Sequence, residues 1–568
     1  MVAGMTIPFT EVLTWSDLES KYAALSRCNL DPDNLYQFLL DWSDLEKEVE
    51  ELQTSLILSV DLNTADEQAN DKLVHFNQVT RPKICVANAE LRNKVLAVTE
   101  PNIPAEAVLV LKRMRSDAMA YRPQNVPLEA EQAHLVTRYS RLTGSQLVNY
   151  EGQKLTIPAI EEKLRDANRG IRERVWRAWQ RAKLQLSPQL DELFLKLFTV
   201  RTTMSRNAGF KNYRELIWLN YHRYDYTAEQ CYELHQSIEK EVVPLASELL
   251  ELQRKGLGVE VLRPWDFYWR SPVDPYNRKP LRPFRSVTDL ENGIQRVFTE
   301  IDAELGEQFA RFCDGFVDLG SRPNKMSHAY CVSFPKRGMP FVLENVVGSE
   351  NDVRVTLHEF GHAFHGFASM QSQPLVWNHF AATEFVEVPS QVMEVLALPF
   401  LHRKHGGFYD DGELARAYWT QISQIVHLLS WIGFMDAIQH WLYAELSAAP
   451  SIASIDAKAR ELIARFMPQT DWSGFEPELG KSWHYHHIFT SPFYYIEYGL
   501  SWLGALQVWQ LSLQDPKAAL AKYKAALRLG NSRSVPELFE EVGARFAFDA
   551  GTIRQLVQFV RRQLRRIT

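Results

Sequence analysis

The sequence predicts a mostly α-helical protein with a small β-sheet next to a metal-binding helix. Apolar residues recur at intervals of three and four along most of the 568-residue chain, which is the spacing of helices with one buried face. Strand patterns are sparse, and the clearest one, Met339–Leu343, comes shortly before two histidines placed four residues apart. No internal repeat and no low-complexity linker is visible in the sequence.

Helical periodicity locates the main elements in chain order. One example is the set Leu190, Leu193, Phe194, Leu197 and Phe198. Similar patterns predict helices over residues 34–57, 128–142, 159–185, 228–254, 411–447 and 517–528. The stretch 257–285 contains several prolines and cannot form a continuous helix, so we expect a structured loop there.

The predicted strand Met339–Leu343 contains Pro340 at its second position. Proline has no backbone N–H and therefore leaves a gap in the hydrogen bonds of a sheet. We accordingly expect this segment to be an edge strand. An unpaired strand edge can form hydrogen bonds with an extended peptide.

Local sequence predicts a helix that begins near residue 350. Ser349–Asp352 supplies capping oxygens and negative charge, both of which stabilise a helix N-terminus. An apolar stripe at helical spacing follows, formed by Val353, Leu357, Phe360 and Phe364. This stripe predicts a buried helix.

The segment His358-Glu359-Phe360-Gly361-His362 lies in the middle of that helix. Residues four apart share a helix face, so both imidazoles can bind one metal ion. Glu359 projects beside them, where it can take a proton from a metal-bound water. The alternative is a surface helix with scattered His and Glu, but the flanking apolar residues favour burial, which is costly for unpaired polar groups. The motif predicts a hydrolytic zinc site.

The third metal ligand distinguishes classes of zinc hydrolase. One class requires Gly and His three and six residues after the second histidine, where this chain has His365 and Ala368. That class is excluded, and His365 is expected either to support a metal ligand or to be a packing residue, rather than to bind the metal itself. A carboxylate from a following helix is the other common solution, and Glu387 has a suitable spacing.

Glu387 belongs to a segment rich in carboxylates. If the segment is helical, Glu384, Gln391 and Glu394 lie on the same face as Glu387. We expect Glu384 and Glu394 to accept hydrogen bonds from the N–H of a ligand histidine. The alternative is an ordinary solvated acidic face.

These motifs together resemble the thimet oligopeptidase and oligoendopeptidase F family of zinc peptidases. The resemblance rests on His358–His362 with Phe385–Gln391, and on His487–Tyr498, which is similar to the His/Tyr substrate segment of that family. Residues 209–214 and 263–266 are similar to the oligoendopeptidase F branch. The match covers residues 200–568, whereas the N-terminal third is similar only in its helical character. One departure is the segment 327–330, which lacks the Gly expected before Ala-Tyr.

The resemblance implies two helical lobes around a deep substrate channel, with a zincin-type active site on its floor. Residues 1–200 would cap the channel and residues 201–568 would form the zinc metallopeptidase region. One Zn²⁺ per chain would be held by His358, His362 and Glu387. The expected activity is that of a zinc metalloendopeptidase acting on short, unstructured peptides.

The resemblance also implies substrate-binding donors in the C-terminal part of the chain. His487, Tyr495 and Tyr498 are similar to the family's residues that orient the substrate and stabilise the oxyanion. His486 is the alternative to His487, and the tyrosines could instead be core aromatics.

Composition is consistent with an oligopeptidase of the cytoplasm. The net charge of −7 offers nothing special to nucleic acid. The five cysteines show no CxxC spacing, which indicates a reducing compartment. The first residues lack the features of a secretory signal, and no segment approaches the ~18 apolar residues of a membrane span. Two alternatives to the peptidase remain: a catalytically inactive peptide-binding protein, and a zinc hydrolase acting on other substrates.

Overall fold

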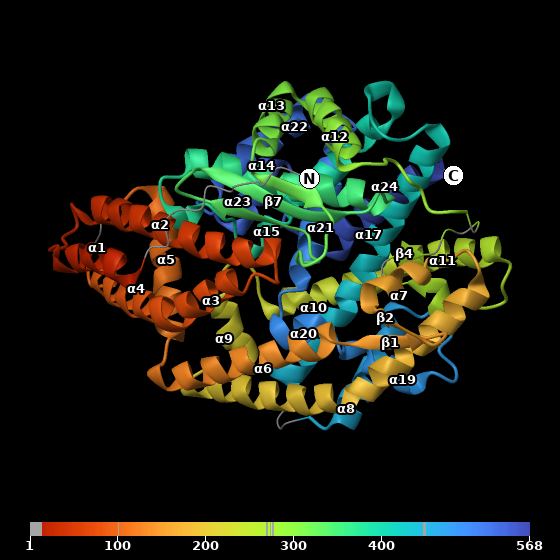
Figure 1. The fold of residues 1–568 in the computed structure, drawn as a ribbon, viewed down its shortest axis with the longest axis horizontal. Coiled ribbons are helices and arrows are strands. Elements are labelled where there is room, and N and C mark those ends of the chain that lie inside the picture. The colour runs from red at the N-terminus through yellow and green to blue at the C-terminus, as the bar shows by residue number, and fades with distance from the viewer. Residues whose placement is uncertain are drawn as a thin grey trace. The chain divides into compact units, whose positions relative to one another are not determined.

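The computed structural model describes residues 14–99, 102–268, 271–272, 274, 276, 278–446 and 450–567. The N-terminal segment, for which the sequence predicts no secretory signal, lies outside these residues. The fold is mostly helical with small sheets, which confirms the predicted fold class (Figure 1). No helix among the described residues is both long and apolar enough to cross a membrane.

The chain divides into two compact units, each built from three segments. Unit 1 comprises Met1–Ala118, Leu281–Leu414 and Gly504–Phe546. Unit 2 comprises Met119–Pro280, Ala415–Leu503 and Ala547–Thr568. The predicted division into a cap and a catalytic region at residue 200 is a functional one and stays a prediction. Helix α8 (Arg169–Asn207) runs through that position without a break.

Unit 1 begins with a helical cluster. It contains α1 (Trp15–Arg27), α2 (Leu35–Leu62), α3 (Glu67–His75), α4 (Arg81–Leu96) and α5 (Ala105–Ala120). Apolar side chains from α1, α2, α4 and α5, such as Leu18, Leu39, Leu91 and Leu111, are buried in one common core. The rest of unit 1 surrounds a small sheet.

That sheet has three strands in the order β5–β7–β6. They are β5 (Val317–Gly320), β6 (Tyr330–Phe334) and β7 (Met339–Val346). The strand predicted at Met339–Leu343 therefore exists, but the prediction that it is an edge strand is wrong. The N–H of Val342 donates toward β5, to Phe316 O at 3.1 Å. Because alternate residues of a strand direct their backbone nitrogens to the same side, the nitrogen of Pro340 also faces β5. Pairing with β5 begins only at Val342, so the N–H that Pro340 lacks is not needed for a hydrogen bond in the sheet.

Helix α14 (Glu350–Ser372) is the central helix of unit 1 and carries the two histidines. Its N-terminus is capped as predicted, because the Ser349 side chain accepts from the N–H of Asp352. It packs against β6, β7, α16 (Val388–Leu396) and α22 (Pro516–Leu529). Phe360 and Phe364 of its apolar stripe meet the rings of Phe309 and Phe298 at centroid distances of 4.6 and 5.0 Å.

Further helices of unit 1 pack against α14 or against its neighbours α16 and α22. They are α12 (Val287–Ile301), α13 (Ala303–Cys313), the single turn α15 (Thr383–Val386) and α23 (Val535–Val542).

Unit 2 is built mainly from long helices. Its elements include α6 (Val126–Gly144), α8, α9 (Tyr213–Asn220), α10 (Ala228–Ser237), α11 (Val243–Leu257), most of α17 (Asp411–His440), α18 (Ile452–Phe466), α19 (Glu476–Gly480), α20 (His486–Thr490), the start of α21 (Ile496–Ser512) and α24 (Ala550–Ile567). A hairpin of β1 (Leu147–Tyr150) and β2 (Gln153–Thr156) lies before α7 (Ile157–Lys163).

The helices predicted from periodicity are largely confirmed. The exception is 159–185, which is interrupted between the end of α7 at Lys163 and the start of α8 at Arg169. The described residues of the proline-rich stretch form no continuous helix, as expected, and include a short pairing of β3 (Phe267–Tyr268) and β4 (Ser271–Pro272). Residues 269–270, 273, 275 and 277 of the predicted loop lie outside the described residues. Asp266 of this stretch is fully buried and accepts from both Arg169 and Arg172. These ion pairs attach the loop to α8.

Candidate active site

The two histidines of α14 and Glu387 converge on one point within unit 1. His358 Nε2 and His362 Nε2 lie 3.2 and 3.4 Å from the same oxygen, Glu387 Oε2. The three residues form one of two groups of potential metal ligands among the described residues. Helical spacing aligns the imidazoles, and packing of α16 against α14 brings the carboxylate to them.

Glu387 lies at a break between two helices rather than within one. It ends α15 and precedes α16, with Pro389 in the first turn of α16. The Ser390 hydroxyl donates to Glu387 Oε2 at 3.2 Å, and Tyr523 Oη donates to the carbonyl of Pro389 at 3.0 Å. The expected single helical face through Glu384, Glu387 and Glu394 is therefore interrupted, and tertiary contacts hold the ligand in place.

Gly361, in the middle of the histidine motif, allows this close approach. A Cβ atom built on Gly361 would lie 2.5 Å from Ser390 Cα and 2.8 Å from the carbonyl oxygen of Pro389. These are backbone atoms and cannot rotate away. Only glycine lets α14 and α16 pack closely enough for Glu387 to reach both histidines.

The hydrogen bond at the far side of His358 determines which of its ring nitrogens is available for a metal. His358 Nδ1 lies 2.7 Å from Glu394 Oε1, and Glu394 is also held by Arg354 at 3.5 Å. A carboxylate accepts, so Nδ1 carries a proton, and in the neutral imidazole the lone pair of Nε2 faces Glu387. When both imidazoles are neutral with the proton on Nδ1, their Nε2 lone pairs and the Glu387 carboxylate repel one another unless a cation lies between them. The donor set and its geometry therefore fit Zn²⁺.

Electrostatics support the predicted roles of the two nearby carboxylates. Glu359 is 7% exposed, and burial raises the pKa of its carboxyl, although His358 and His362 offset part of the shift. A raised pKa suits a general base. Burial also acts to raise the pKa of Glu387, but His362 and His358 hold it well below its usual range. Glu387 is therefore an anion that can bind a metal.

The other carboxylate predicted to support a histidine, Glu384, is buried, and its Oε2 accepts from the Thr383 hydroxyl at 3.3 Å. Glu394 makes the contact with a ligand histidine that we expected. His365 is buried against the ring of Phe385, and burial lowers the pKa of its imidazole to about 3. It is not part of the convergent group.

The predicted substrate donors belong to unit 2 and form an aromatic cluster. His487 lies 4.8 Å from Tyr495 and 5.9 Å from Tyr498 between ring centroids, and the two tyrosines are 5.3 Å apart. Tyr495 is fully buried, whereas His487 and Tyr498 are half-buried. His486 is exposed. Their catalytic roles stay predictions.

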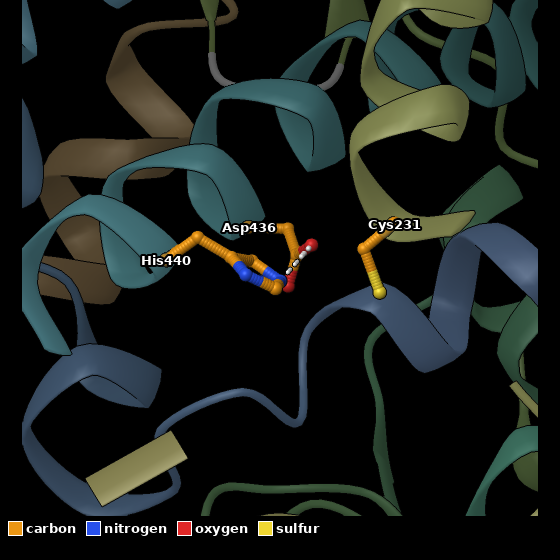
Figure 2. Close-up of side chains that lie close together, drawn as sticks. All are labelled: Cys231, Asp436 and His440. Carbon is orange, nitrogen blue, oxygen red and sulfur yellow. Dashed lines mark ion pairs between the residues drawn. The ribbon is translucent and has the colours of Figure 1, made fainter. Parts of the chain in front are cut away.

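The second group of potential metal ligands is Cys231, Asp436 and His440, all fully buried in unit 2. In Figure 2, Asp436 and His440 project toward each other from α17, while Cys231 comes from α10. His235 Nε2 and His440 Nε2 lie 2.7 and 3.3 Å from Asp436 Oδ2. Sequence analysis did not identify this group, because Cys231 is 205 residues before Asp436 in the sequence.

Hydrogen bonds around this second group do not suit a metal ion. Arg214 Nη1 lies 3.1 Å from His440 Nδ1, and a guanidinium can only donate. His440 Nδ1 must therefore accept, which leaves the proton on Nε2, facing Asp436. Burial also raises the pKa of the Cys231 thiol well above its usual range, so the thiolate is disfavoured. We interpret the group as a buried hydrogen-bond network.

Three contributors to the site in unit 1 were not identified from the sequence. They are Gly361, Ser390 and Arg354. Glycine within a helix costs about 0.5–1 kcal/mol relative to alanine, so its presence inside a buried helix was a usable indication of close packing. The contacts of Ser390 and Arg354 had no comparable local pattern.

Comparisons with known proteins identify the family of the chain. The sequence profile of Peptidase family M3 matches residues 163–558. The oligoendopeptidase F homolog of Borreliella burgdorferi is 20% identical over 516 residues, which cover 86% of this chain and 81% of that protein. Oligopeptidase A of Haemophilus influenzae is 24% identical, with 45% of each chain covered. The solved structure of PZ peptidase A with inhibitor 2 has a TM-score of 0.89 at 23% identity and covers 99% of both chains. Because the family profile spans more than half of the sequence, this chain belongs to peptidase family M3.

Proposed function

We propose that the chain is a zinc-dependent endopeptidase that hydrolyses short, unstructured peptides. The observation that carries the proposal is the convergence of His358 Nε2, His362 Nε2 and Glu387 Oε2, with His358 Nδ1 bonded to Glu394. Buried Glu359 next to this group supports hydrolytic chemistry. The names of the relatives, oligoendopeptidase F and oligopeptidase A, support a peptide substrate.

His358, His362 and Glu387 would hold one Zn²⁺ per chain. When bound, the metal supplies Lewis acidity and lowers the pKa of water to about 7. Glu359 accepts a proton from the attacking water while the oxygen of that water forms a bond to the scissile carbonyl carbon. Glu359 then delivers that proton to the leaving amine as the C–N bond breaks. Glu394 keeps His358 oriented throughout.

We assign substrate contacts to two further regions. The half-buried His487 and Tyr498 are proposed as donors to the substrate carbonyl, with the fully buried Tyr495 holding both rings in position. In unit 1, β6 rather than β7 is an edge strand, and we propose that it pairs with the extended peptide. The influence of Glu359 on the pKa of Cys331 in β6 supports this placement.

The compartment is also part of the proposal. All five cysteines are free thiols, which supports a reducing environment, and we place the enzyme in the cytoplasm.

Metal removal and product analysis test the proposal together. Dialysis against a strong chelator should abolish cleavage of a random peptide mixture, and added zinc should restore it. Mass spectrometry should show cuts inside the peptides, while a folded protein stays intact. Metal analysis should give one zinc per chain. Full activity in the metal-free enzyme would refute the mechanism, and removal of single terminal residues would refute the endopeptidase assignment.

A further inference from the structure

A pocket in unit 2 is lined by one face of α8. Trp176, Trp179, Gln180 and Lys183 lie at positions i, i+3, i+4 and i+7 and all contribute to its wall. The pocket encloses about 860 Å³, counting its opening to solvent. None of these side chains has a part in the proposed peptidase chemistry.

Two hydrogen-bond donors in this wall lack partners among the described residues. Gln180 is only 8% exposed, yet its amide makes no hydrogen bond there. Lys183 has no carboxylate within ion-pair distance, and its Nζ lies 5.3 Å from the ring centroid of Trp179. Burial without a counter-ion lowers the pKa of the Lys183 ammonium to about 8. A buried amide without a hydrogen bond and a half-buried cation without a counter-ion are costly unless a ligand completes them.

The rest of the pocket is mainly aromatic. Its other large apolar walls are Phe267, Trp431, Trp472 and Tyr485. Such a surface binds a flat, apolar group by stacking and edge contacts. Ligand pockets typically combine such walls with a few fixed polar groups.

Two further ionisable residues of the pocket limit which chemical groups a ligand can carry. His484 is already occupied, because its Nε2 lies 2.8 Å from Asp191. Glu478 lines the pocket and has no hydrogen-bond or ion-pair partner among the described residues. A ligand whose only polar group is a carboxylate offers no donor to Glu478, whereas one with both a carboxylate and an N–H can satisfy Lys183 and Glu478 together.

We propose that this pocket binds the C-terminal residue of a short peptide, with its free carboxylate on Lys183 and Gln180 and an aromatic side chain among the tryptophans. The N–H of that residue donates to Glu478. The inference rests on the proposed function for its choice of a peptide ligand. It adds a preference for peptides that end in Phe, Tyr or Trp.

Calorimetric titration of the full-length protein tests this with two probes, N-acetyl-L-phenylalanine and its carboxamide. The acid should bind about tenfold more tightly or better, because hydrogen bonds to charged groups exceed neutral ones. Lys183→Met keeps the aliphatic stem and should remove that preference. N-acetyl-L-alanine should bind much more weakly than the phenylalanine probe.

Lys196→Met is the matched control. Lys196 lies on the same helix, is paired with Glu192 at 2.6 Å and does not line the pocket, so the preference for the acid should persist. Equal affinity for acid and amide, or an unchanged preference in Lys183→Met, would overturn the inference; the second result would place the carboxylate elsewhere, such as on a metal. The titration requires no turnover. A protein that binds the acid but cleaves no peptide would refute only the proposed function.

Discussion

The ligand group of unit 1 and the buried group of unit 2 contain similar residues, but the hydrogen bonds around their histidines run in opposite directions. In unit 1, His358 Nδ1 meets a carboxylate, so Nε2 of the neutral imidazole presents a lone pair. In unit 2, His440 Nδ1 meets the guanidinium of Arg214, so Nε2 presents a proton. The comparison shows that the hydrogen-bond partner of Nδ1 determines whether Nε2 of a histidine in a His/carboxylate cluster can bind a metal ion.

The largest effect should come from Glu359→Gln. The substitution preserves shape but removes the proton acceptor, so turnover should fall by about 10²–10⁴-fold. Zinc content should be unchanged, because Glu359 is not one of the three converging residues. Steady-state kinetics with metal analysis provide the check. Loss of zinc in this variant would mean that Glu359 is a ligand or a structural residue.

The second-largest loss of turnover should come from Tyr498→Phe, which tests whether unit 2 contributes to catalysis. If Tyr498 donates to the oxyanion, Tyr498→Phe should lower turnover by about 10²–10³-fold with little change in substrate affinity. A fluorogenic peptide assay measures this, and a melting curve should be unchanged. Tyr494→Phe, a half-buried neighbour in the same ring cluster, is the control. Near-normal turnover would show that Tyr498 is a packing residue.

Glu394→Gln tests the hydrogen bond that distinguishes the two groups. The amide accepts more weakly than the carboxylate, so zinc affinity should drop by about 10–100-fold, measured by competition with a chelator of known affinity. Glu384→Gln is the matched control, since Glu384 is equally buried but bonds to Thr383. Equal losses in both variants would indicate a general effect of negative charge rather than control of the tautomer.

The smallest effect on function should come from the group in unit 2. His440→Phe removes a ring that contacts Asp436 and Arg214, so unfolding by urea should require about 1–3 kcal/mol less free energy. Metal content should stay at one zinc per chain and turnover should be nearly normal. A second metal ion in the wild-type protein that disappears in this variant would contradict the comparison.

Local sequence was sufficient to predict the parts of the site that depend on a single helix. The alignment of His358 with His362 follows from helical periodicity, and the start of α14 follows from the capping residues Ser349 and Asp352. Glu387 was identified from its spacing and its family-like surroundings. Most long helices were also predictable, because their apolar stripes repeat within one continuous segment.

Contacts between elements could not be predicted in this way. The position of β7 at the centre of its sheet depends on where β5 and β6 lie, and the close approach of Gly361 to Ser390 depends on how α14 and α16 pack. The contact of Glu394 with His358 likewise depends on how α16 packs against α14.

The sequence by itself determined which side chains share a helix face, because backbone geometry repeats every 3.6 residues. Tertiary structure alone decided which group contacts Nδ1 of each histidine. It is the carboxylate of Glu394 on α16 for His358 and the guanidinium of Arg214 on α9 for His440. A histidine can bind a metal through one nitrogen only when the other is free to carry the proton. Which ring nitrogen carries the proton depends on a hydrogen-bond partner from a different helix. The periodicity of a single segment cannot predict that partner.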